Sequence, residues 1–219
     1  MEETLSFVLE MIGTIACAIS GIRLAATKNF DWFGAYIVGL VTAIGGGTLR
    51  DLLLDIPVFW MHNGWYLGVT ALSLLAVILF RNLLVSKDRM LFLFDSIGLA
   101  MFTVIGIDKT LAIGLQMWVA IVMGTITGAF GGVIRDILIN EVPLVFRKDI
   151  YATACLMGGI VYWLIYASTT AAYVAPISCA VTIILLRYLT LRYNLSLPIL
   201  SQKPRSNPLP PSKSSKNGE

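Results

Sequence analysis

Seven apolar stretches, each about long enough to cross a lipid bilayer, take up almost the whole of this 219-residue chain. A membrane-spanning helix needs about 20 apolar residues, because each residue adds about 1.5 Å to its length. The stretches lie at roughly 5–26, 33–54, 65–82, 90–107, 117–139, 150–168 and 173–191. With a mean hydropathy of +0.81, they predict an all-α integral membrane protein with seven transmembrane helices.

The Lys and Arg residues outside these spans predict how the chain is oriented. They gather in the loops at 23–28, 81–89 and 147–148 and in the C-terminal tail, whereas the other side carries only Lys109. The side richer in basic residues is normally cytoplasmic. We therefore expect a multi-pass protein of the cell (inner) membrane with an external N-terminus and a cytoplasmic C-terminus. The net charge of +3 then reflects topology, and no folded basic surface indicates a nucleic-acid partner.

One motif occurs twice, 85 residues apart. The copies are Gly46-Gly47-Thr48-Leu49-Arg50-Asp51-Leu52-Leu53 and Gly131-Gly132-Val133-Ile134-Arg135-Asp136-Ile137-Leu138. Each copy lies in a unit of three spans, an odd number, so the second unit enters the membrane from the opposite side. We predict two inverted three-helix repeats at 1–84 and 85–170, a seventh helix at 171–192 and a disordered basic cytoplasmic tail at 193–219. The same offset relates Phe7 to Phe92, Glu10 to Asp95, Gly13 to Gly98, Gly21 to Gly106, Gly39 to Gly124 and Thr42 to Thr127.

Runs of glycine interrupt the second and fifth spans. Gly45, Gly46 and Gly47 are consecutive in one, and Gly131 and Gly132 are consecutive in the other. Such a run weakens a helix and can free backbone carbonyls near the middle of the membrane. We favour a kink that exposes polar backbone to a pathway; close packing of helices through small residues is the alternative.

Four charged residues within the spans have a symmetric arrangement. Glu10 and Arg50 lie at similar depth near the external side, and Asp95 and Arg135 lie at similar depth near the cytoplasmic side. Pairing offsets the cost of burying each charge alone. We expect the buried ion pairs Glu10–Arg50 and Asp95–Arg135, which either serve a pathway or fasten the helices to one another.

Other oxygen-bearing side chains near the motif are candidate pore or ion-binding groups. Thr42 and Thr127 are equivalent in the two repeats, and Thr48, Asp51 and Asp136 lie within the motif itself. The two aspartates are available to a cation if they face the pathway. Each can instead pair with the adjacent arginine or cap a broken helix.

Motifs for enzymatic or metal chemistry are missing from the sequence. It contains no P-loop, no GxSxG and no HExxH, so we expect no enzyme and no catalytic residues. Cys17, Cys155 and Cys179 lie in apolar spans without CxxC spacing, and His62 is the only histidine, so neither a metal site nor a cofactor is expected.

The two inverted repeats, the seventh helix and the paired Gly-Gly-x-x-Arg-Asp motifs resemble the prokaryotic members of the trimeric intracellular cation (TRIC) channel family. The resemblance covers about residues 5–191. It implies a homotrimer in the lipid bilayer, in which each protomer has its own pore for monovalent cations, potassium or sodium. That pore is bounded mainly by the first, second, fourth and fifth spans and narrows at the glycine kinks. The Lys-Glu-Val sequence of the animal members is replaced here by Ile134-Arg135-Asp136.

Related bacterial sequences are also described as possible glycine transporters, and the residues fit both functions. A potassium channel needs weak, oxygen-rich sites along a wetted path, which glycine backbone, threonines and an acid supply. A carrier of glycine or another small amino acid needs fixed partners for a carboxylate and an ammonium, which an Arg and an Asp supply. The channel is favoured, with the secondary transporter as the alternative.

Overall fold

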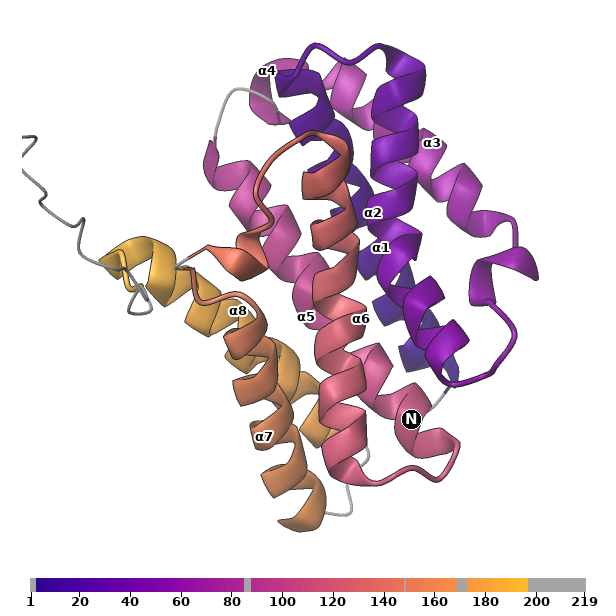
Figure 1. The fold of residues 1–219 in the computed structure, drawn as a ribbon, viewed down its shortest axis with the longest axis vertical. Coiled ribbons are helices and arrows are strands. Elements are labelled where there is room, and N and C mark those ends of the chain that lie inside the picture. The colour runs from indigo at the N-terminus through magenta and orange to yellow at the C-terminus, as the bar shows by residue number, and fades with distance from the viewer. Residues whose placement is uncertain (1–2, 85–87, 148, 169–172, 197–219) are drawn as a thin grey trace, which may run out of the picture.

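The computed structural model describes residues 3–84, 88–147, 149–168 and 173–196, and within these ranges it is built from helices alone (Figure 1). Five helices are long and apolar enough to cross a membrane, and two shorter apolar helices complete the predicted seven. The five are α1 (Glu3–Thr27), α2 (Trp32–Leu53), α5 (Asp88–Ala112), α6 (Met117–Leu138) and α8 (Val174–Tyr193), and the two shorter ones are α3 (Trp65–Leu79) and α7 (Ala152–Ser168). Short turns of helix are α4 (Arg81–Leu84), η1 (Phe59–Met61) and η2 (Leu144–Phe146). Most of the predicted tail, residues 197–219, lies outside the described residues.

Four helices form the centre of the bundle. α1 packs against α2 and α5, and α6 packs against α5 and α2. α3 lies against α1 and α2 on one side, while α7 and α8 lie against α6 and α5 on the other (Figure 1). The fold is therefore two inverted three-helix repeats, α1–α3 and α5–α7, with α8 as the seventh helix.

The turns between helices recur at the repeat offset. α1 is followed by Asn29 at φ 59°, and α5 is followed by Gly114 at φ 81°. α2 is followed by Asp55 at φ 53°, and α6 is followed by Asn140 at φ 59°. Asn, Asp and Gly are the residues that tolerate this left-handed conformation best. α1 and α2 thus end in the same way as their counterparts, α5 and α6.

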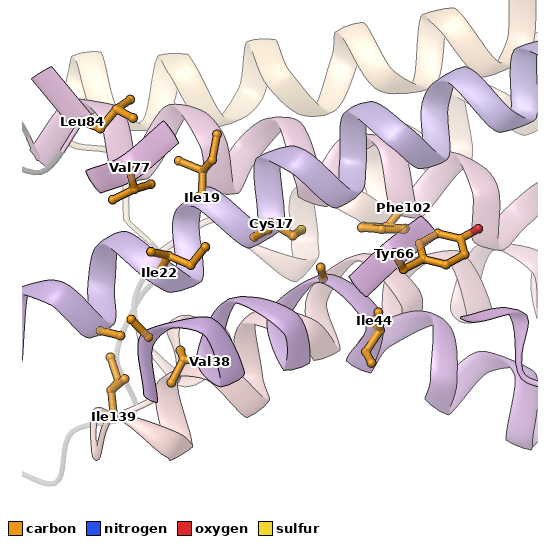
Figure 2. Close-up of a cluster of buried hydrophobic side chains, with 14 of the residues drawn as sticks. Cys17, Ile19, Ile22, Val38, Ile44, Tyr66, Val77, Leu84, Phe102 and Ile139 are labelled. Atoms are coloured by element: carbon orange, nitrogen blue, oxygen red, sulfur yellow. The ribbon is translucent and has the colours of Figure 1, made fainter. Parts of the chain in front are cut away.

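Two apolar clusters form the core, one for each repeat. The first is formed mainly by α1, α2 and α3, with Ile22 and Val38 among its members, and it also includes Phe102 of α5 (Figure 2). The second joins α5, α6, α7 and α8. At the seam between them, a Cβ on Gly98 would lie 2.3 Å from Cys17 Sγ, and one on Gly13 would lie 3.3 Å from Phe102 Cε2. The contacts are reciprocal, because 13 and 98, and 17 and 102, are equivalent positions.

Candidate functional site

The two copies of the motif meet where α2 crosses α6. A Cβ added to Gly46 would lie 1.9 Å from the carbonyl oxygen of Thr127, and one added to Gly131 would lie 2.3 Å from the carbonyl oxygen of Thr42. Any side chain at either position would collide with the backbone of the facing helix. The absence of side chains at these positions is what allows the two helices to approach so closely.

The other predicted hinge glycines also lie at contacts. A Cβ on Gly45 would meet Ile134 Cδ1 at 2.9 Å, one on Gly47 would meet a Phe59 ring carbon at 2.5 Å, and one on Gly132 would meet Tyr151 Oη at 2.5 Å. α2 and α6 are each a single unbroken α-helix through these positions. Close packing through small residues therefore accounts for these glycines in this conformation. A bend at these glycines during function stays a prediction.

The three candidate threonines bond within their own helices. Thr42 Oγ1 donates to Val38 O, and Thr127 Oγ1 donates to Met123 O, both at 2.6 Å. Thr48 Oγ1 donates to the Ile44 carbonyl and accepts from Trp60 Nε1. At the crossing it is the carbonyl oxygens of Thr42 and Thr127 that face the opposite helix.

Each aspartate of the motif joins its adjacent arginine to the loop after the helix. Arg50 Nε donates to Asp51 Oδ1 at 2.8 Å, and the backbone N–H of Phe59 donates to Asp51 Oδ2 at 2.9 Å. Asp51 is 1% exposed. Asp51 therefore pairs with the adjacent Arg50, which is one of the alternatives that the sequence leaves open. The second copy repeats the arrangement with Arg135, Asp136 and Leu144 at 2.9 and 3.0 Å.

Asp95 is the centre of a buried cluster at one end of the α2–α6 pair. Arg135 Nη1 donates to Asp95 Oδ1 at 2.5 Å and to Ser20 Oγ at 2.7 Å, so the expected Asp95–Arg135 ion pair is present. A second arginine, Arg187 of α8, lies 3.4 Å from Asp95 Oδ2. Asp95 is therefore shared between two cations from two different helices.

Glu10, the counterpart of Asp95, has different partners. Tyr66 Oη donates to Glu10 Oε2 at 2.9 Å, and Lys109 Nζ lies 2.7 Å from Glu10 Oε1. Among the ion pairs of the described residues, Arg50 pairs with Asp51 and not with Glu10. The expected Glu10–Arg50 pair is wrong, because Lys109 reaches Glu10 from α5 and the Arg50 guanidinium is held by its neighbour and lies 5.6 Å from the centre of the Phe59 ring.

Acidic and basic side chains thus balance at both ends of the α2–α6 pair, although the residues differ. Each end has two acids and two cations, and because the repeats are inverted these clusters lie at opposite ends of the α2–α6 pair. The repeat supplies three members of each cluster, and the fourth differs: Lys109 at one end and Arg187 at the other. Balanced charges of this kind can remain buried in a membrane at modest cost.

A cavity of about 380 Å³ opens beside the Asp95 cluster. It reaches from the buried charges to the C-terminal end of α8. Its polar lining consists of Asp95, Arg135, Asp149, Arg187, Thr190, Asn194 and Ser196. No group of three or more His, Cys, Asp or Glu side chains that could hold a metal ion occurs in the part of the chain that the structure describes.

Sequence reasoning missed four members of these clusters: Tyr66, Lys109, Tyr151 and Arg187. Tyr66 bonds Glu10, and Tyr151 is buried against the Arg187 guanidinium. The signal for the tyrosines was present, because 66 and 151 are 85 residues apart. Lys109 and Arg187 have no equivalent basic residue in the other repeat, so the repeat carries no signal for them.

Comparison with known proteins finds relatives over nearly the whole chain. A family model described as "Glycine transporter" matches residues 7–82 and 92–167, two stretches offset by 85 residues. A UPF0126 membrane protein of Vibrio cholerae is 40% identical over 200 residues, covering 90% of this chain and 84% of that protein. The UPF0126 inner membrane protein YadS of Escherichia coli is 40% identical over 197 residues, covering 87% and 93%.

Solved structures of similar fold include the TRIC trimeric intracellular cation channel orthologue from Rhodobacter sphaeroides. The two chains superpose with a TM-score of 0.83 at 32% sequence identity, covering 88% of this chain and 100% of that one. A prokaryotic TRIC channel crystallised in 0.5 M KCl superposes with a TM-score of 0.80 at 31% identity, covering 87% and 98%.

Proposed function

We propose, for a chain that belongs to the prokaryotic TRIC family, that it is a potassium-permeable cation channel with one pathway in each protomer of a homotrimer. The pathway runs between α2 and α6. The solved relatives at 31–32% identity are described as trimeric cation channels, which supports both the activity and the assembly. The YadS relative is described as an inner membrane protein, which supports the same location. The uneven distribution of Lys and Arg residues supports an external N-terminus and a cytoplasmic C-terminus.

The observation that carries the proposal is the crossing of α2 and α6. Two backbone carbonyls, those of Thr42 and Thr127, face glycines of the opposite helix, and a buried acid–base cluster lies beyond each end of the crossing. Carbonyl oxygens are suitable weak ligands for a dehydrating potassium ion. In this conformation the helices touch, so conduction requires α2 and α6 to separate at Gly46 and Gly131.

A glycine carrier is the second candidate, because the matching family model has that description. A zwitterionic substrate would need a free arginine for its carboxylate and a free acid for its ammonium. Arg50 and Arg135 already hold Asp51 and Asp136 at 2.6–2.9 Å, and both aspartates also accept a backbone N–H. A substrate would have to break these bonds, which favours the channel.

Two recordings on the same purified protein separate the candidates. Planar bilayers in asymmetric KCl should show discrete open events that reverse near the potassium potential, and proteoliposomes should show no saturable glycine uptake. Silent bilayers together with glycine uptake would establish the carrier instead.

A pair of glycine variants then tests the pathway. Gly131→Ala should raise the open probability, because the new methyl group meets the Thr42 carbonyl and pushes apart the two helices that must separate for conduction. Gly68→Ala is the matched control, since no heavy atom lies within 4 Å of a Cβ at Gly68. If both variants conduct like the unmodified chain, the pathway is not at this crossing.

A further inference from the structure

Arg187 is a buried cation that the repeat does not supply. It lies on α8, outside both three-helix units, and is 1% exposed. Its guanidinium lies 3.4 Å from Asp95 Oδ2 and from Ser96 Oγ, and 3.3 Å from the carbonyl oxygen of Ile150. These distances are long beside the 2.5 Å between Arg135 and Asp95. Arg187 is therefore the more loosely bonded of the two cations on Asp95.

Aromatic rings hold the guanidinium from the side. Its central carbon lies 4.2 Å from the centre of the Phe92 ring and 5.0 Å from the centre of the Tyr151 ring. Both distances suit a cation–π contact. The rings keep the positive charge of Arg187 at the wall of the 380 Å³ cavity, whichever polar partner it bonds.

One acidic side chain at the wall of this cavity is not held by a cation of the described residues. Asp95 and Asp136 are balanced by Arg135 and Arg187, whereas Asp149 has no ion pair among the described residues. Removal of the Arg187 charge would make the wall of the cavity more negative by one charge, because Asp95 would keep only one of its two cations.

We propose that this cavity is the ion vestibule at the Asp95 end of the pathway, and that Arg187 limits how many cations it holds. Figure 1 shows the C-terminal end of α8 beside the loop that follows α6, and both segments contribute to the cavity wall through Asn194 and Leu144. A fixed positive charge at the wall of a narrow, low-dielectric space lowers the local cation concentration, and a fixed negative charge raises it. The inference rests on the proposed channel function and assigns α8 a role in conduction that neither repeat has.

The test is single-channel conductance of full-length protein as a function of KCl concentration. Arg187→Gln should raise the conductance about twofold or more at about 0.05 M KCl, because a unit charge within a few ångströms changes ion occupancy by about that factor. The increase should vanish at about 1 M KCl, where charges are screened within about 3 Å. Arg187→Lys, which keeps the charge, should conduct like the unmodified chain.

Arg192→Gln is the matched control, because Arg192 is an exposed arginine of the same helix that does not line the cavity. It should leave the conductance unchanged. If Arg187→Gln does not assemble, Asp149→Asn decides, since it should lower the conductance at low salt and not at high salt.

Equal conductance of Arg187→Gln and the unmodified chain at low salt would overturn the inference, as would equal effects of the Gln and Lys variants. An unchanged Asp149→Asn would overturn it as well. An unmodified chain that passes no potassium current would overturn the channel itself and the inference with it, so the two failures are distinguishable.

Discussion

Gly46→Ala should destabilise this protein more than a substitution of one methyl group normally does. The added Cβ would lie 1.9 Å from the carbonyl oxygen of Thr127, and real Cβ atoms essentially never come within 3.0 Å of another heavy atom. The obstacle is backbone inside a buried helix, so it cannot rotate away as a side chain would. α2 and α6 must separate by about 1.1 Å, the difference between these two distances.

Overpacking of this kind costs about 1–3 kcal/mol. For a chain of this length, each kcal/mol lowers the melting temperature by about 2–4 °C, so a decrease of roughly 2–12 °C is expected. The assay is thermal unfolding of purified protein in detergent, followed by circular dichroism. Gly68→Ala, in open space on α3, should leave the melting temperature unchanged or raise it slightly.

The reciprocal geometry makes a sharper test with the double variant. Gly131→Ala should behave like Gly46→Ala, because its Cβ would lie 2.3 Å from the carbonyl oxygen of Thr42. Once one methyl group has separated the helices, the second finds part of its space already open, so the combined loss should be smaller than the sum. Additive losses, or a Gly46→Ala protein as stable as Gly68→Ala, would refute the close crossing.

Three further predictions concern the charges and the topology. In double-mutant cycles of thermal stability, alanine substitutions at Asp95 and Arg135 should be strongly coupled, because loss of one partner of a buried ion pair costs about 3–5 kcal/mol. Alanine substitutions at Glu10 and Arg50 should be much closer to additive. Equal coupling in both cycles would contradict the observed pairing. Asp51→Asn should lower the melting temperature by several degrees, because it removes the only ion-pair partner of Arg50 among the described residues, and an unchanged melting temperature would count against this role. A reporter enzyme fused after Leu191 should be active on the cytoplasmic side alone, and external activity would reverse the proposed orientation.

The fold was predictable because a bilayer permits only a few kinds of backbone structure. A span must be apolar for about 20 residues, so seven such stretches already indicate seven helices. The 85-residue offset and the odd number of spans then require inversion. The sequence pattern even contains the matching helix ends, since Asp55 and Asn140 are equivalent positions with the same left-handed backbone.

The site was less predictable, because depth along a helix does not say which face a side chain is on. Glu10 and Arg50 were matched by depth alone, yet Lys109 approaches Glu10 from a third helix and Arg50 turns to its own neighbour. Arg187 lies close to the C-terminal end of the last span, where no sequence pattern separates it from the basic tail. Its role depends on how α8 packs against α5, which no local pattern encodes.

The role of the glycine runs is also difficult to predict from the sequence alone. Consecutive glycines are expected wherever a helix breaks and also wherever another backbone needs the space, and the composition is identical in the two cases. In α2 and α6 a backbone carbonyl of the other repeat lies opposite the glycines, so the glycines allow the two helices to contact each other. Only the position of the partner helix distinguishes the two explanations.

The reciprocal contacts between the halves have the form of a symmetric dimer interface contained in one chain. Gly46 touches Thr127 and Gly131 touches Thr42, just as residue i of one subunit touches j of its partner and j touches i. In a dimer of identical subunits one mutation would alter both contacts at once. Here the two contacts are encoded separately, so the halves can diverge in sequence, and Lys109, whose counterpart in the first half is Leu24, is an example of such divergence. At the crossing itself that freedom is absent, because both contacts share a single distance between helices, and a change in either half moves the other.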